Sequence, residues 1–181
     1  MGRVTELVVL VSNDGQPVGT AEKATVHTND TVLHLAFSCH VFNAEGHVLV
    51  TRRALSKKTW PGVWTNSFCG HPGPDEALEE ALHRRAREEL GFTVTRVSEA
   101  LPNFRYRAVD ASGIVENEIC PVFVAHSDDV PRPIASEVCE LRWVAPADLL
   151  TAIAATPWAF SPWITLQLPA LADAGLLGPR H

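Results

Sequence analysis

The sequence lacks the features of membrane-spanning and nucleic-acid-binding proteins. No apolar run approaches the roughly 20 residues that cross a bilayer. The apolar segment Leu7–Val11 is short, has Glu6 beside it and runs into the turn signal Ser12–Gly15, so it predicts a strand and not a targeting segment. A net charge of −6 provides no general attraction for nucleic acid or anionic lipid. We therefore expect a cytoplasmic protein with neither a nucleic-acid nor a membrane partner.

The sequence also lacks the cysteine pattern typical of a disulfide framework. The four cysteines lie far apart and form no CxxC pair: Cys39, Cys69, Cys120 and Cys139. Without a secretory signal, each is expected to be a small, buried apolar residue. Only Cys69, which is followed by Gly70 and His71, has neighbours that suggest chemistry.

The 181 residues suit one domain with a sizeable core, since 46% are apolar and 20% are charged. Two turn signals predict β-hairpins. Asn13–Gly15 interrupts the apolar segment Val4–Thr20, and Asn43–Gly46 separates Leu33–Phe42 from Val48–Arg52.

The clearest predicted helix runs from Asp75 to Leu90. Its apolar stripe repeats every four residues, at Leu78, Leu82, Ala86 and Leu90. We expect Asp75 to be the N-cap, Glu76 and Glu79 to lie in the first turns, and Gly91 to end the helix.

The remaining elements predict a mixed architecture. Ser56–Pro72 is rich in Trp, Pro and Gly, which indicates a long structured loop. We expect strands at Thr93–Val97, Arg105–Val109, Glu116–Ala125 and Leu141–Val144, and helices at Pro146–Ala154 and Pro162–Leu171. This order predicts an α/β (α+β) fold with a mixed β-sheet packed between helices.

The loop and the first long helix carry a spaced motif: Gly70-x5-Glu76-x7-Arg84-Arg85-Ala86-Arg87-Glu88-Glu89-Leu90-Gly91-Phe92. Glu89 lies one helical turn beyond Arg85, so the two share a face. Adjacent carboxylates suit Mg²⁺, which takes one or two carboxylates together with phosphate oxygens. An isolated Glu-Glu pair is more often a solvated helix surface, so the full spacing carries the prediction.

That spacing resembles the Nudix box and implies a Nudix fold. Every fixed position is met except one, where Arg85 replaces a glutamate. The replacement removes a metal ligand of Nudix hydrolases and offers a guanidinium to phosphate. The resemblance therefore implies a retained fold with altered chemistry. A Nudix hydrolase of a diphosphate substrate, or a non-catalytic Nudix module that binds metal or phosphate, is the alternative.

A second set of chemically capable residues is spread through the chain: His27, His34, Cys69, His71, Glu116 and Glu118. Glu116 and Glu118 are two apart in a predicted strand and so point to the same side. Imidazoles and carboxylates together suit Mn²⁺, Mg²⁺ or Zn²⁺. Spacing alone does not show that these residues meet, and a single histidine is more often an ordinary residue.

Several segments resemble the type 1 isopentenyl-diphosphate Δ-isomerases, in the right order from about Glu22 to Trp163. They are Thr51–Lys58, Trp60–Ser67, Cys69–Pro72, Phe104–Arg107, Gly113–Glu118 and Thr156–Trp163. The resemblance implies an isomerase that interconverts isopentenyl and dimethylallyl diphosphate in isoprenoid biosynthesis. It also implies a single domain over residues 1–181, with a Nudix-like core at about 32–165, an N-terminal β-hairpin and a C-terminal helical extension.

The same resemblance implies the site residues. The metal ligands would be His27, His34, His71, Glu116 and Glu118. Cys69 and Glu118 would be the catalytic pair, with Tyr106 assisting the carboxylate and Trp163 beside the reacting carbons. Glu89 would hold a second ion, Mg²⁺, with the diphosphate, whose cationic partners would be Lys23, Arg53, Lys57 and Arg85. The expected partner is a small prenyl diphosphate, and we expect a monomer or weak dimer.

Overall fold

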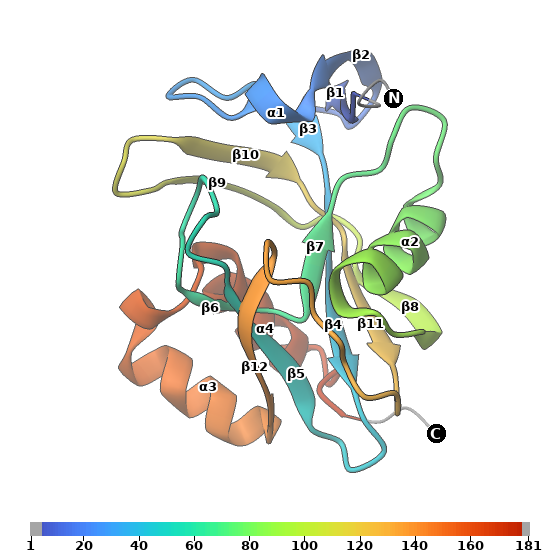
Figure 1. Ribbon diagram of the computed structural model, residues 1–181, viewed down its shortest axis with the longest axis vertical. Helices are drawn as coiled ribbons and strands as arrows, with labels where there is room; N and C mark the ends of the chain where they lie inside the picture. The colour runs from blue at the N-terminus through green and yellow to red at the C-terminus, as the bar shows by residue number, and fades with distance from the viewer. Residues whose placement is uncertain (1–4, 179–181) are drawn as a thin grey trace.

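The computed structural model describes residues 5–178, which form two mixed β-sheets and four α-helices (Figure 1). The first sheet has the order β2 (Pro17–Glu22), β1 (Leu7–Val11), β3 (His34–Leu35), β10 (Val115–Ile119) and β9 (Arg105–Val109). The second has the order β12 (Val138–Val144), β5 (Val48–Arg53), β4 (Phe37–Phe42), β11 (Val122–His126) and β8 (Thr95–Leu101). Two short strands extend it, β6 (Trp64–Thr65) beside β5 and β7 (Phe68–Gly70) beside β4. The helices are α1 (Lys23–Val26), α2 (Leu78–Leu90), α3 (Pro146–Ala155) and α4 (Pro162–Asp173), with a 3₁₀ turn η1 (Pro157–Ala159) before α4.

Two segments were predicted as single strands, and this was wrong because each forms two strands, one in each sheet. Leu33–Phe42 breaks into β3 and β4 at Ala36, and Glu116–Ala125 breaks into β10 and β11 at Cys120-Pro121. The reason for the second break is local, because proline has no N–H to donate to a ladder. The two segments run parallel to each other in both sheets, so the chain passes twice, side by side, from one sheet to the other.

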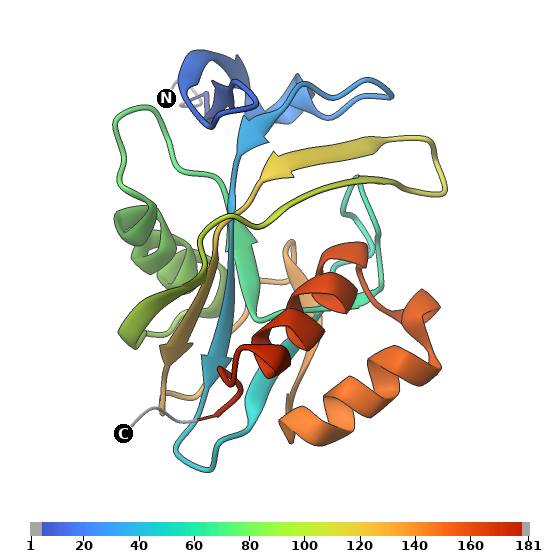
Figure 2. The ribbon, with the colours of Figure 1, turned by 180° about the vertical axis from the view of Figure 1, so that it is seen from behind.

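The second sheet packs between helices, which confirms the predicted fold class. Along β4, successive side chains alternate between the two faces. One face packs on α2, in a core that includes Phe37, Cys39, Val41, Leu82, Ala86 and Leu90. The other packs on α3 and α4, in a core that includes Phe42, Val124, Leu149, Ile153, Ile164 and Leu168. Figure 2 shows α3 and α4 together on this second face.

The start of α2 differs from the prediction. Asp75 is not the N-cap, because it adopts a left-handed conformation with φ of 63° and the helix begins three residues later, at Leu78, after the N-cap Ala77. Glu76 therefore precedes the helix, where its carboxylate accepts a hydrogen bond from the Gly73 N–H and pairs with Arg84. The predicted end is confirmed, since Gly91 has φ of 62° and its N–H reaches back to carbonyls of the last turn.

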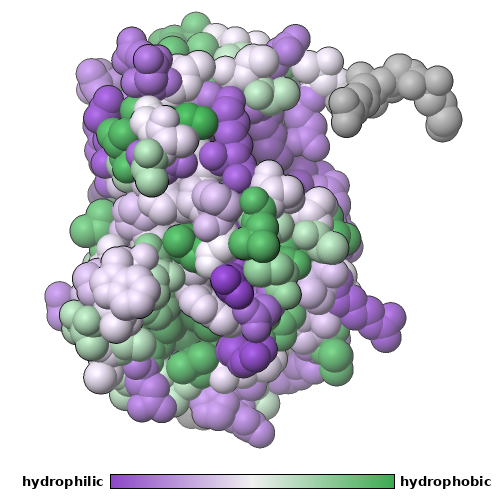
Figure 3. All heavy atoms as spheres, turned by 60° about the vertical axis from the view of Figure 1, so that its left-hand side comes forward, coloured by the Kyte–Doolittle hydropathy of each residue, from purple (hydrophilic) through white to green (hydrophobic). Residues whose placement is uncertain are grey.

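Both predicted hairpins form, β1 with β2 and β4 with β5, although Val4 lies outside the described residues. The 56–72 segment is a loop interrupted by β6 and β7. Within residues 5–178, no helix has the length and apolar character needed to span a bilayer. On the face in Figure 3, hydrophilic residues gather in the upper part and hydrophobic ones are interspersed below.

Candidate active site

A cavity of about 830 Å³ opens where the two sheets meet. Strands of both sheets, the loop before β6, and helices α1, α2 and α4 contribute to its walls. All but one of the predicted site residues line it: Lys23, His27, Arg53, Lys57, Cys69, His71, Arg85, Glu89, Tyr106, Glu116, Glu118 and Trp163. The exception, His34, is fully buried behind Glu118. The fold thus brings together residues that are far apart in the sequence.

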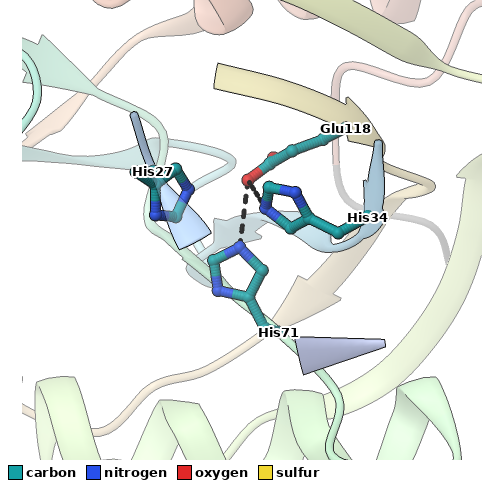
Figure 4. Close-up of side chains that lie close together, drawn as sticks. All are labelled: His27, His34, His71 and Glu118. Atoms are coloured by element: carbon teal, nitrogen blue, oxygen red, sulfur yellow. Dashed lines mark hydrogen bonds and ion pairs between the residues drawn. The ribbon is translucent and has the colours of Figure 1, made fainter. Parts of the chain in front are cut away.

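One wall of the cavity is a compact cluster of three imidazoles and a carboxylate (Figure 4). His27, His34, His71 and Glu118 each offer a ligand atom, and these atoms lie within 4.8 Å of one another. Glu116 is beside them, with its Oε2 3.0 Å from His27 Nε2 and its Oε1 accepting a hydrogen bond of 2.7 Å from Thr59.

The cluster fits a divalent cation. The Nδ1 of His34 lies 2.8 Å from the Val32 carbonyl oxygen, to which it donates, so in the neutral ring the lone pair is on Nε2. The buried Nε2 atoms of His27 and His34 make no hydrogen bond, although carboxylate oxygens lie 3.0 and 3.4 Å away. Buried nitrogens without partners, next to buried carboxylates, form the donor set expected of a metal site.

The charges of the cluster are interdependent. Burial alone would raise the pKa of Glu118, but its interactions with His34 and His71 hold that pKa well below its usual range. Burial would lower the pKa of His34, and the Glu118 carboxylate outweighs this and raises it. The Tyr106 hydroxyl donates a 2.9 Å hydrogen bond to Glu118 Oε2, and burial raises the pKa of this tyrosine well above its ordinary value.

Cys69, on β7, lies in the cavity wall. Its thiol donates to Asn66 Oδ1 at 3.2 Å, and the Ser38 hydroxyl lies 3.3 Å from its sulfur. Burial raises the pKa of Cys69 to about 12, with the hydrogen bond to Ser38 acting in the opposite direction. The free site therefore contains a neutral thiol.

Sequence reasoning assigned no role to Asn66, although it lies inside one of the resembling segments. Its amide nitrogen donates to the Cys39 and Phe68 carbonyls, which fixes Oδ1 toward the site. Besides the thiol of Cys69, that oxygen accepts a 3.0 Å bond from the indole N–H of Trp163. One buried amide therefore orients two of the four predicted catalytic side chains, Cys69 and Trp163.

Aromatic rings form the apolar part of the cavity. The Trp163 ring lies 5.6 Å from Tyr106 and 5.5 Å from Trp60, measured between centroids. The guanidinium carbon of Arg53 sits 5.3 Å from the Trp163 centroid. The same guanidinium group donates to the Thr59 carbonyl at 2.8 Å, so a hydrogen bond and the Trp163 ring together fix its position.

The other three predicted cations are each held by a carboxylate. Lys23 pairs with Glu6 at 2.6 Å, and Lys57 pairs with Glu137 at 2.6 Å. The Arg85 guanidinium bonds Glu89 through two nitrogens and lies 3.7 Å from Glu137. Glu6 and Glu137 were not predicted, because no motif surrounds them.

Solved structures define the fold. A protein of Deinococcus radiodurans, DR0079, matches with a TM-score of 0.71 at 22% identity, over 91% of this chain and 98% of its own. A MutT protein from Methanosarcina mazei matches with a TM-score of 0.63 at 18% identity, over 79% of this chain and 95% of its own. The family model of the NUDIX domain matches residues 32–164.

Sequence relatives define the family more narrowly. Proteins called isopentenyl-diphosphate Delta-isomerase match at 65% identity in Clavibacter sepedonicus, covering 100% of this chain and 92% of the relative. One from Corynebacterium glutamicum matches at 56% identity, covering 91% and 90%. The chain therefore belongs to the NUDIX domain family and, within it, to the isopentenyl-diphosphate Delta-isomerases.

Proposed function

We propose that this protein interconverts isopentenyl and dimethylallyl diphosphate. The observation that carries the proposal is one cavity, around which a buried His/carboxylate cluster, a thiol, an aromatic wall and four cations are gathered. Moving the double bond requires a proton on one carbon and the removal of another from a neighbouring carbon. The cavity offers a group suited to each step.

The proton transfers are assigned to Glu118 and Cys69. In one direction, a protonated Glu118 donates to the alkene, with Tyr106 hydrogen-bonded to its carboxyl group, and Cys69, as a thiolate, takes a proton from the neighbouring carbon. With the protonation states of the free site, a neutral Cys69 thiol and a Glu118 carboxylate, the thiol is the donor and the carboxylate the acceptor. The roles exchange in the reverse direction, because the reaction is reversible. Each positioned acid or base contributes about 10²–10⁴-fold.

A divalent ion would be held by His27, His34, His71, Glu116 and Glu118. Mn²⁺, Mg²⁺ or Zn²⁺ suits this mixed set. When bound, the ion would polarise the Glu118 carboxyl group and make proton donation easier. In its absence Glu118 is held as a carboxylate by His34 and His71, as its lowered pKa indicates.

The intermediate formed by protonation is a tertiary carbocation, and the aromatic wall suits it. A π-face stabilises a desolvated positive charge by about 2 kcal/mol. Trp163 is held in place by Asn66 and lies against Tyr106, so its ring is fixed at the cavity wall. We assign Trp163 to stabilisation of the cation.

The diphosphate would bind at Lys23, Arg53, Lys57 and Arg85. Glu89, bonded to Arg85 at the end of α2, would hold a second ion, Mg²⁺, with the phosphate oxygens. Because Arg85 occupies the position where the Nudix box has glutamate, this helix offers a phosphate-binding guanidinium in place of a metal ligand.

The test is to incubate the metal-loaded protein with isopentenyl diphosphate in D₂O and follow the reaction by NMR. We expect dimethylallyl diphosphate that carries deuterium, and its loss after EDTA treatment. Released phosphate with no isomer would support a Nudix hydrolase instead. No reaction in the presence of metal would leave only a binding module and contradict the proposal.

We also propose that residues 1–181 form one domain, a monomer or weak dimer, that works in the cytoplasm on a small prenyl diphosphate in isoprenoid biosynthesis. The family assignment and the absence of a membrane-spanning helix in residues 5–178 support this. Size-exclusion chromatography with light scattering would test the state of association.

A further inference from the structure

A chain of buried polar side chains runs from the Cys69 thiol into the core between β4 and α4. Ser38 Oγ lies 3.3 Å from Cys69 Sγ and 2.9 Å from Gln167 Nε2. Gln167 Oε1 lies 3.0 Å from His40 Nε2. Ser38, His40 and Gln167 are each 0% exposed. Polar groups buried this deeply cost stability unless they are hydrogen-bonded, as these three are to one another.

Donor and acceptor roles along the chain follow from its far end. His40 Nδ1 is buried and makes no hydrogen bond, and burial lowers the pKa of His40 to about 4, so the ring is neutral. The single ring proton is therefore on Nε2 and is donated to Gln167 Oε1. This orients the amide so that Nε2 donates to Ser38 Oγ.

The near end completes the assignment. The Cys69 thiol proton is directed to Asn66 Oδ1, so in the contact between Ser38 and Cys69 the hydroxyl is the donor. Ser38 Oγ also lies 3.4 Å from Cys120 Sγ, whose thiol can donate to the remaining lone pair. The protons of the Ser38 hydroxyl, the two thiols and the His40 ring then each have one acceptor.

We propose that Ser38 is a positioning residue for Cys69, and that Gln167 and His40 set the direction of its hydroxyl. The inference rests on the proposed role of Cys69 in the isomerase reaction. The chain is not a proton wire, because an amide interrupts it and it ends at a buried ring. Its effect is to donate a hydrogen bond to the sulfur from the core side, so that the S–H is left to point to Asn66.

The test measures kcat and KM of the metal-loaded protein for isopentenyl diphosphate in Ser38→Ala and Gln167→Met. Loss of one neutral hydrogen bond should lower kcat by roughly five- to tenfold in Ser38→Ala, and by less in Gln167→Met. KM should stay unchanged, because the diphosphate cations lie elsewhere in the cavity. Ser127→Ala is the matched control, since it removes another buried serine hydroxyl, which bonds Thr93 far from the thiol.

Double-mutant coupling separates positioning from simple core damage. If Gln167 acts only through Ser38, the double variant should lose no more kcat than Ser38→Ala alone. The Cys69 S–H infrared band, assigned by its loss in Cys69→Ala, should shift in both single variants and not in Ser127→Ala. Ser38→Thr, which keeps the hydroxyl, should restore kcat.

Three outcomes would overturn the inference: unchanged kcat in folded Ser38→Ala, additive losses, or an S–H band that does not move. If Ser38→Ala fails to fold by circular dichroism, Gln167→Met and its S–H band decide alone. A wild-type protein that makes no dimethylallyl diphosphate would instead contradict the proposed function. These failures are therefore distinguishable.

Discussion

The two charged walls of the cavity are built in opposite ways. In the His/carboxylate wall, buried ring nitrogens of His27 and His34 make no complete hydrogen bond and face the carboxylates of Glu116 and Glu118 at 3.0 and 3.4 Å, a donor set that suits a bound cation. The cationic wall consists of Lys23, Arg53, Lys57 and Arg85. In it, Lys57 and Arg85 are already paired with carboxylates. The ring nitrogens of the first wall need a metal ion as their partner. The cations of the second wall must give up a carboxylate partner to bind the diphosphate. Ligand removal should therefore affect the first wall most, and single charge changes should tune the second.

Of the changes considered, metal removal should have the largest effect on turnover. Dialysis against EDTA should abolish turnover, because it removes the ion that would polarise the Glu118 carboxyl group. Production of dimethylallyl diphosphate, measured by NMR, should return on addition of Mn²⁺, Mg²⁺ or Zn²⁺. Full turnover in protein whose metal content is far below one ion per chain would contradict a catalytic metal.

Cys69→Ala should lower kcat by about 10²–10⁴-fold, because it removes one of two proton-transfer groups. The His/carboxylate wall should remain intact, so metal content should not change. Cys139→Ala is the control, since that cysteine is exposed on β12. Near-wild-type kcat in Cys69→Ala would contradict the assignment of Cys69 as a proton-transfer group.

The sequence predicted the elements with local signals and failed where tertiary packing decides. The stripe ending at Leu90 and the following Gly91 located α2 well. The break at Ala36 carries no local mark, because β3 and β4 read as one apolar run. Pro121 was the available signal for the other break, since a proline inside a strand argues against continuous pairing.

The site divides in the same way. Most of the predicted metal and catalytic residues lie in segments that resemble the family, with His27 and His34 as exceptions, and all of them except His34 line one cavity. Glu137 and Gln167 come from segments without a motif, and their importance depends on what packs against them. Gln167 left one trace, a polar residue between the buried Ile164 and Leu168 of α4.

Within the cationic wall, Arg53→Ala should raise KM by roughly tenfold, since one charge-assisted contact to the diphosphate is lost. The adjacent Arg52 is the matched control. It points to the other side of β5, where it pairs with Glu140 and does not line the cavity. Arg52→Ala should change KM less than about twofold. Equal effects of the two substitutions, measured in steady-state kinetics, would contradict the assignment to Arg53.

The smallest expected effect has the opposite sign and tests partner exchange directly. Lys57 and Arg85 outweigh burial and lower the pKa of Glu137, so Glu137 is a carboxylate at neutral pH. It competes with the diphosphate for both cations. Glu137→Gln should therefore lower KM by about two- to fivefold, and the gain should shrink as salt screens the charges.

Glu140→Gln is the control for this substitution, because it removes a carboxylate that pairs with Arg52 outside the cavity. It should leave KM unchanged. A rise in KM in Glu137→Gln would mean that Glu137 orients Lys57 and Arg85 for the diphosphate and does not compete with it. The cationic wall would then be preorganised by its carboxylates, and the contrast between the two walls would be one of charge alone.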